Sequence, residues 1–424
     1  MRKICMLLAA AALAGCGGGS NPAATSGNPS SPGAGGTSSG GAQPPAVIQA
    51  MDEGSAVNPA IVTADNAFGL SLFQNLNANA TGNVAISPIS VAMALQILYN
   101  GAAGTTQSAM AQTLQLGTLS TQDLNSDNAA LMASLIGADP QVQVIVANSL
   151  WMHLSNNPVL PSFTQTDQNF YGATVGDLSG APANVNSWVD TETNGLITQM
   201  LPNGDYSGLV ALIANVIYFK GPWTTAFDPS QTVAAPFTLV DGTQVSSQMM
   251  HQSGSYAYLQ GANFQAVRLP YGQGRLSMLI VLPNSSADFN SFVAGITAAT
   301  LNGWIGQLQG SPGSIAVPRF TSAYGASLPS ALSALGMGIA LCSSNSADFS
   351  ALAPGVCVSD VEHRTIVEVD ETGTVAAGAT TITVTPTVAM TGQFTMTMDH
   401  PFFYAIQDDQ TGELLFIGTL VDPG

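Results

Sequence analysis

The sequence predicts an α+β protein, because patterns typical of helices come early in the chain and patterns typical of strands come late. Between Asp65 and Leu76, apolar residues that include Phe68 and Leu72 recur at helical spacing. Residues 209–219 are instead continuously apolar, as in a strand that is covered on both faces. With 46% hydrophobic and 8% charged residues among 424, the chain can bury a large core.

Four further segments complete the predicted order of elements. A second helix is expected to begin after Pro88 and to stop at residues 100–101. Residues 141–151 alternate and then become apolar, like a strand that enters a core, and residues 266–282 contain a glycine-rich turn typical of a hairpin. Residues 414–421 are expected to form the last strand. The sequence contains no internal repeat, phosphate-binding loop or cluster of metal ligands, so neither a cofactor nor a metal is expected.

The chain is strongly acidic, with 25 Asp and Glu against 7 Lys and Arg and a formal net charge of −18. Nucleic acids and anionic lipid surfaces repel such a charge, so neither is expected as a general partner. Four histidines are present, but no serine has the strand-turn-helix setting of an activated nucleophile. A serine hydrolase is therefore not expected.

The first 15 residues have the features of a secretory signal: a basic start, a short apolar run and small residues before Cys16. The apolar run is too short to span a bilayer stably as a helix. Residues 13–16, Leu-Ala-Gly-Cys, resemble the bacterial lipobox, in which the cysteine is lipidated. We therefore predict a lipoprotein signal at 1–15 and an exported protein held at the bacterial outer membrane only by the lipid on Cys16. An ordinary signal peptide with secretion is the alternative, and the periplasmic and surface faces of the membrane both stay open.

Residues 16–47 consist mainly of Gly, Ser, Pro, Ala, Thr and Asn and show no apolar periodicity, which predicts a flexible tether. Its root-mean-square reach is ~30 Å. The folded domain is expected to span 48–424, and two of the four cysteines, Cys342 and Cys357, lie within it. An exported protein could join them in a disulfide, but two free buried thiols fit the sequence equally well.

The stretch from Glu371 to Met390 has an unusual composition. It contains small and β-branched residues and no Lys, Arg or aromatic. Ala and Gly stabilise an ordinary strand poorly, but small side chains fit between strands that are already in place. In a strand, one face of this stretch would be small and then apolar, and the other would become polar in its second half. Pro386 lacks the N–H that a central strand donates and marks a stop. Such a segment could exist both outside a sheet and within one.

The run V-E-H-R-T-I-V-E-V-D-E-T-G-T-V-A-A-G-A-T at 361–380 resembles the strand and hinge at which a serpin, a serine-protease inhibitor, opens its central sheet. Other serpin-like blocks appear elsewhere in the chain in the expected order, and most of them precede this run. They include N-V-A-I-S-P-I-S-V-A-M-A-L, L-I-A-N-V-I-Y-F-K-G-P-W, L-P-Y, V-P-R-F and D-H-P-F-F-Y-A-I. They extend from about Ala56 to the C-terminus. The resemblance implies a serpin-like α+β fold with about nine helices, three β-sheets and an exposed, mobile reactive-centre loop at about 371–395.

The resemblance also implies that the chain is not an enzyme but an irreversible, suicide-type inhibitor of serine proteases, and that it acts as a monomer. The protease would attack the loop and form a covalent acyl-enzyme, and the cleaved loop would then enter the central sheet as a new antiparallel strand. Alternatives are a non-inhibitory serpin-fold binding protein, a cross-class inhibitor of papain-like cysteine proteases, and an unrelated surface lipoprotein that binds a ligand in an apolar pocket.

The scissile bond has two candidate positions. Family spacing from the hinge places it between Thr387 and Val388, whereas counting back from D-H-P-F points near Met390. Thr, Val, Ala and Met in this part of the loop favour an elastase-like protease, and the absence of Lys and Arg argues against a trypsin-like one.

Serpin motifs also assign candidate site residues, and Arg319 could pair with Glu371. The assigned residues are Glu371, Gly373, Thr374, Ala376, Ala377, Gly378 and Ala379 in the hinge, Ser87, Ser90, Asn215 and His363 in a hydrogen-bonded shutter behind the sheet, and Trp223 in the breach where insertion starts.

Overall fold

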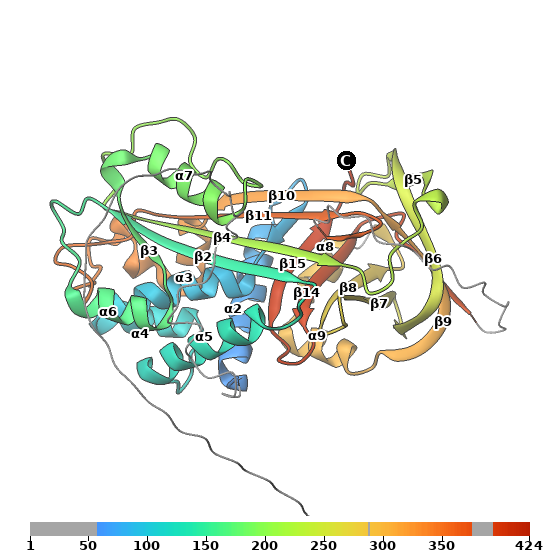
Figure 1. Cartoon of the computed structure of the whole chain (residues 1–424), viewed down its shortest axis with the longest axis horizontal. Helices are drawn as coiled ribbons and strands as arrows, with labels where there is room; N and C mark the ends of the chain where they lie inside the picture. The colour runs from blue at the N-terminus through green and yellow to red at the C-terminus, as the bar shows by residue number, and fades with distance from the viewer. Residues whose placement is uncertain (1–56, 287–288, 375–392) are drawn as a thin grey trace, which may run out of the picture. The chain divides into compact units, whose positions relative to one another are not determined.

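The computed structural model describes residues 57–286, 289–374 and 393–424 (Figure 1). All of these belong to one unit of contacts that spans Ala42–Gly424. The predicted signal, lipidation site and tether lie outside the described residues, as does most of the predicted loop.

Helices dominate the first part of the described chain and strands the second, which confirms the α+β class. The α-helices of the described residues are α2 (Pro59–Asn77), α3 (Pro88–Gly101), α4 (Gly104–Thr113), α5 (Thr121–Ile136), α6 (Pro161–Phe170), α7 (Ala183–Glu192), α8 (Phe289–Ala294), α9 (Ala298–Ile305) and α10 (Pro329–Leu332).

Strands form two hydrogen-bonded sheets. The strands are β1 (Val84–Ile86), β2 (Gln143–Met152), β3 (Thr174–Asp177), β4 (Ala211–Pro222), β5 (Val233–Thr238), β6 (Gln244–Gln260), β7 (Phe264–Tyr271), β8 (Leu276–Pro283), β9 (Gln309–Pro318), β10 (Phe320–Ser327), β11 (Asp360–Val369), β12 (Gly373–Thr374), β13 (Phe394–Thr397), β14 (Phe402–Asp408) and β15 (Leu414–Leu420).

The central sheet has the strand order β10-β11-β12-β4-β2-β3. β4 is antiparallel to β2, β11 is parallel to β4, and β10 is antiparallel to β11. β12 contributes only two residues, which lie between β11 and β4 at one end of the sheet. Figure 1 shows the long strands of this sheet side by side.

The second sheet has nine strands, in the order β1-β15-β14-β8-β7-β6-β9-β13 with β5 on the side of β6. Its long strand β6 pairs with β7 through its last residues and with β9 along most of its length. This continuity joins strands that the resemblance divides between two smaller sheets, so the expected three sheets form two hydrogen-bonded sheets in the described part of the chain.

The two faces of β4 explain its continuously apolar sequence. Ile213 and Ile217 lie in the main hydrophobic core, and α3 packs against this face of the strand. Leu212 and Val216 point the other way, into a second cluster that includes Trp188 of α7. Figure 1 shows α7 beside the strands of the central sheet. Because both faces are covered, β4 has no solvent-facing row of polar residues.

α3 begins where its sequence predicts. The Ser87 hydroxyl caps the helix by accepting a hydrogen bond from the Ser90 N–H at 3.3 Å, and Pro88 occupies the first turn, where no N–H is needed. The cap holds Ser87 directly behind the central sheet. No helix in the described ranges is long and apolar enough to cross a membrane.

Candidate functional site

The predicted hinge has already begun to enter the central sheet. Thr374 pairs with Val369 of β11 on one side and with Gly221 of β4 on the other, and both pairings are antiparallel. Gly373 pairs with Pro222. The first two residues of a new strand therefore lie between two strands that are parallel to each other.

Gly373 occupies a place that no larger residue could take without a shift of the backbone. A Cβ atom built on Gly373 would lie 2.1 Å from the Gly221 carbonyl oxygen and 2.7 Å from the Pro222 Cα. The absence of a side chain thus lets the hinge approach β4 closely enough to pair with it.

Thr374 is held by a hydrogen bond inside the main core. Its side chain is 1% exposed, and its Oγ1 lies 2.6 Å from the Tyr271 hydroxyl. The Tyr271 ring stacks on Trp223 with their centroids 4.4 Å apart. The breach tryptophan therefore supports the tyrosine that holds the first buried hinge residue.

The backbone before Thr374 is fixed by the segment that follows β4. Trp223 donates its indole N–H to the Asp370 carbonyl and its backbone N–H to the Thr372 carbonyl, each at 2.9 Å. Phe227 donates its backbone N–H to the Glu371 carbonyl at 2.9 Å. These three bonds hold the turn between β11 and β12 in place.

Glu371 forms the ion pair that the sequence suggested with Arg319. Its carboxylate accepts a hydrogen bond from the Arg319 Nε at 2.7 Å and another from the Thr232 hydroxyl. Burial alone would raise the pKa of this carboxyl, but the hydrogen bonds from Arg319 and Thr232 outweigh burial and lower the pKa below its usual value. Glu371 is therefore ionised at neutral pH and fastens the hinge to the second sheet.

Replacing Arg319 by methionine is expected to weaken this attachment. The Arg319 side chain is 46% exposed whereas Glu371 is buried. We therefore expect the free energy of unfolding to fall by about 1–2 kcal/mol, a value between those typical of a surface ion pair and of a buried one. Urea unfolding of the original protein, Arg319→Met, Glu371→Gln and the double variant measures the coupling free energy between the two side chains. If the two single effects simply add, the pair does not stabilise the hinge.

The four predicted shutter residues lie in one buried network. His363 accepts a hydrogen bond from the Ser87 backbone N–H through Nε2 at 3.1 Å, so its proton is on Nδ1, which donates to the Asn215 Oδ1 at 2.7 Å. Asn215 donates to the Ser90 carbonyl at 2.7 Å and to Asn148. The network links β11 to β4 and both strands to the start of α3.

Burial lowers the pKa of His363 from 6.5 to about 3, because no charged partner replaces the water that an imidazolium would need. The unfolded chain binds this proton near pH 6.5 and the folded chain only near pH 3. The stability that the buried, neutral His363 allows is therefore complete above pH 6.5 and is lost as the pH falls below 6.5. We expect the free energy of unfolding to fall by ~2 kcal/mol between pH 6.5 and 5 from this group.

A His363→Gln variant separates this effect from the other titrating groups, because Gln keeps a donor and an acceptor but does not titrate. Urea unfolding of both proteins at pH 7 and pH 5 should show a smaller loss of stability at pH 5 in the variant. An identical loss in the two proteins would rule His363 out as its source.

Parallel pairing of β4 with β11 extends only over part of their length. It runs from Leu212 and Asp360 to Val216 and Arg364. We call this junction, residues 212–216 against 360–364, the seam. In the described residues, the next contact between these strands is made through β12, so the hinge stands at the open end of the seam.

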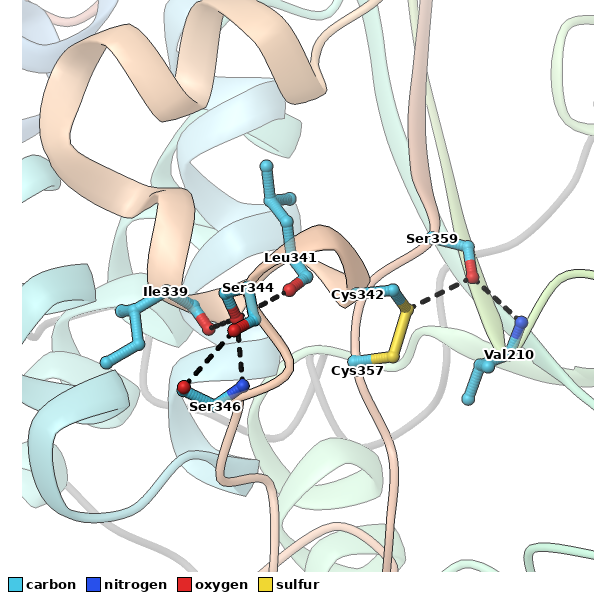
Figure 2. The surroundings of a disulfide bond; sticks show 8 residues. All are labelled: Val210, Ile339, Leu341, Cys342, Ser344, Ser346, Cys357 and Ser359. Atoms are coloured by element: carbon cyan, nitrogen blue, oxygen red, sulfur yellow. Dashed lines mark hydrogen bonds between the residues drawn. A yellow bond between two sulfur atoms is a disulfide. The ribbon is translucent and has the colours of Figure 1, made fainter.

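The predicted site residues that the structure describes lie in two clusters, the hinge residues with Trp223 at one end of β4 and the shutter network around His363. The roles of these residues in insertion stay predictions. It also joins Cys342 and Cys357 in a disulfide, which settles the pairing that the sequence left open (Figure 2). The described ranges hold no group of three or more His, Cys, Asp or Glu that could bind a metal. Predicted residues that lie outside the described residues are Cys16, Ala376, Ala377, Gly378, Ala379, Thr387, Val388 and Met390.

Three residues of the site were not predicted. Tyr271 belongs to the L-P-Y block that contributed to the resemblance, so its sequence context was a usable signal. Asn148 lies in the strand predicted at 141–151, whereas Thr232 lies in a segment without a distinctive pattern. Only the folded chain brings Thr232 to Glu371 and Asn148 to Asn215.

A family model described as Serpin (serine protease inhibitor) matches residues 63–423. The chain belongs to the serpin family. The human "Leukocyte elastase inhibitor" is 30% identical over 379 residues, which cover 85% of this chain and 99% of the relative. The structure of a thermophilic serpin, tengpin, in the native state superposes with a TM-score of 0.80 at 26% identity and covers 87% of this chain and 95% of tengpin.

Human thyroxine-binding globulin in complex with thyroxine superposes on this serpin with a TM-score of 0.77 at 25% identity and covers 86% of this chain and 98% of the globulin. These matches confirm the predicted family and fold. Serpins are commonly protease inhibitors.

Proposed function

We propose that this serpin irreversibly inhibits serine proteases by cleavage of its loop and insertion of the cleaved loop into the central sheet. The observation that carries the proposal is the position of Gly373 and Thr374, which lie between β11 and β4 and are antiparallel to both. Any further insertion would extend a ladder that has already started.

If it continued, the register of that ladder would give each later residue a place between β4 and β11. Each step forward along the loop is one step backward along both β4 and β11. Continued pairing would therefore put Thr380 between Asn215 and His363, which now share a hydrogen bond of 2.7 Å. Insertion would replace this bond with contacts to the new strand, so the shutter network has to open.

The same register matches the two faces of the loop to the two faces of the sheet. Thr374 faces the main core, so alternation would turn Ala376, Gly378 and Ile382 the same way. Ile382 would then lie between Ile213 and Val361, which are both core residues. Small residues would thus be the first to enter between β4 and β11 after Thr374, and the apolar Ile382 would reach the apolar interior.

Trapping would follow from the distance that insertion covers. The protease serine attacks the loop carbonyl and becomes acylated, and the amine of the new C-terminal peptide leaves. About fourteen residues at ~3.4 Å each would then carry the attached protease ~50 Å. Displacement of the catalytic groups by even an ångström slows deacylation by orders of magnitude.

Specificity is proposed from the loop sequence. Thr387 before the bond and Val388 after it, or Met390 in the alternative position, suit a protease with a small to medium apolar pocket. The similarity to a leukocyte elastase inhibitor supports the same elastase-like class.

Incubation with pancreatic elastase tests the proposal. A covalent complex that survives SDS is expected, and the mass of the released C-terminal peptide would show whether the cut follows Thr387 or lies near Met390. Cleavage without a complex would contradict inhibition of elastase and favour the non-inhibitory alternative, and a parallel reaction with papain tests the cross-class alternative.

We also propose that the chain is an exported bacterial lipoprotein, on the basis of its first 16 residues. That it acts as a monomer is proposed from its membership of the serpin family. A Cys16→Ser variant should lose metabolic labelling with palmitate and leave the membrane fraction. Unchanged labelling would contradict lipidation at this cysteine.

Small-molecule binding is a second candidate function, because the breach contains a pocket of about 310 Å³. Trp223, Phe227, Tyr256 and Arg268 contribute to its lining. Its volume lies at the lower end of the range for ligand sites. If elastase forms no complex with the serpin, this pocket becomes the leading candidate site.

A further inference from the structure

The Cys342–Cys357 disulfide lies beside the end of the seam farthest from the hinge (Figure 2). Ser359 connects the two features: its Oγ is 3.3 Å from the Cys342 Sγ and accepts a hydrogen bond from the Val210 N–H at 2.8 Å. Ser359 also donates its backbone N–H to the Ala211 carbonyl at 2.9 Å. One residue therefore contacts the disulfide and closes the seam at its foot, which we define as Ser359 against residues 210–211.

The disulfide also ties this foot to the helical layer. Cys342 donates its backbone N–H to the Val358 carbonyl at 2.9 Å, and Val358 donates to the Ala340 carbonyl at 3.1 Å. Ala340 ends a short 3₁₀-helix, η5 (Gly338–Ala340), that packs against α4. With the bond closed, the start of β11 cannot move away from α4 independently of this turn.

Insertion has to open the foot. The register set by Gly373 and Thr374 would place Val384 between Ala211 and Ser359, so the last residues to enter must separate these two. The gap there would widen from one strand spacing, ~4.8 Å, to two. The hydrogen bond from the Val210 N–H to the Ser359 hydroxyl and that from the Ser359 N–H to the Ala211 carbonyl would both break.

We propose that the Cys342–Cys357 disulfide is a redox modification site that controls how readily the seam opens. This inference rests on the proposed function, because it concerns the same insertion. In the oxidised protein the disulfide keeps the foot of β11 against α4 and slows insertion of an uncleaved strand. Reduction frees the foot, and the uncleaved loop then enters the sheet. No exposed segment is left for a protease to cleave.

The chemistry requires a dithiol reductant. Its thiolate attacks one sulfur of the disulfide, the S–S bond breaks, and a mixed disulfide forms. The second thiolate of the reductant resolves this intermediate. Two electrons and two protons are transferred in total, which yields the Cys342 and Cys357 thiols and the cyclic disulfide of the reductant. Neither cysteine is fully buried, so a small dithiol could reach the bond.

A synthetic peptide can report seam opening directly without any protease. A fluorescein-labelled peptide with the sequence of residues 375–385, V-A-A-G-A-T-T-I-T-V-T, should anneal to the full chain as a strand between β4 and β11, beyond the chain's own Thr374. We expect annealing, measured by fluorescence anisotropy, to be about tenfold faster after treatment of the folded protein with dithiothreitol.

A Cys342→Ser/Cys357→Ser double variant is the matched control, because it removes this disulfide and leaves every other residue unchanged. The variant should anneal the peptide at the fast rate with and without reductant. Equal rates for oxidised and reduced protein, a slow double variant, or no annealing in any form would overturn the proposal.

The elastase assay separates this inference from the proposed function. A protein that traps elastase but anneals the peptide equally fast in both redox states would refute only the disulfide's role. A protein whose annealing depends on the disulfide but that forms no complex with any serine protease would refute only the inhibitory function.

Discussion

Replacing Thr374 by arginine is expected to turn the inhibitor into a substrate. Thr374 is 1% exposed and lies between two strands, with its hydroxyl against that of Tyr271. A guanidinium at this position would need a buried partner that the described surroundings do not offer, and an unpaired buried charge costs several kcal/mol. The substitution should therefore expel residue 374 from its place between β11 and β4, and insertion after cleavage would have to bury it again. A cost of ~3 kcal/mol for that step would slow insertion by about 100-fold, so that hydrolysis of the acyl-enzyme would be faster than trapping.

The measurement is the yield of SDS-stable complex with elastase against the yield of cleaved serpin. Thr374→Arg should give almost only the cleaved chain. Thr374→Ser is the matched control, because it keeps the hydroxyl that reaches Tyr271 and should form complex at close to the original yield. An arginine variant that traps elastase as efficiently as the original would show that entry of residue 374 does not limit insertion.

Local patterns predicted the elements that position the site. The helix after Pro88, the strand around residues 209–219 and the hairpin around 266–282 all appear, as α3, β4 and β7–β8. Each depends on residues near in sequence, such as the cap at Ser87 or the continuous apolar run of a strand that is covered twice.

Contacts between distant segments could not be read from such patterns. The Arg319–Glu371 pair joins residues 52 positions apart, and the Tyr271–Thr374 contact joins residues 103 apart. The resemblance to a family suggested the first contact, but only the folded chain shows the second. Local periodicity also gives no information on strand register, which here aligns the hinge with the seam.

The pairing of the two cysteines and the division of the strands into sheets could not be predicted from local patterns either. Spacing allowed Cys342 and Cys357 to pair but did not require it, because pairing depends on how the intervening loop folds back. The continuity of the second sheet depends on β6, whose length allows it to pair with both β7 and β9.

The second large effect is expected when the loop is cut. If the native fold stores free energy that insertion releases, the intact serpin is a kinetically trapped state, and its melting temperature reports a rate as much as an equilibrium. A completed strand would add about a dozen backbone hydrogen bonds to each neighbour and close the sheet, at roughly 1 kcal/mol for each bond.

Thermal unfolding of the intact and the loop-cleaved protein, followed side by side by circular dichroism, tests the central claim most directly. We expect the cleaved form to melt ~20 °C or more above the intact form, because the inserted strand stabilises the whole central sheet. A cleaved protein that melts at the temperature of the intact one, or below it, would contradict insertion as the source of inhibition.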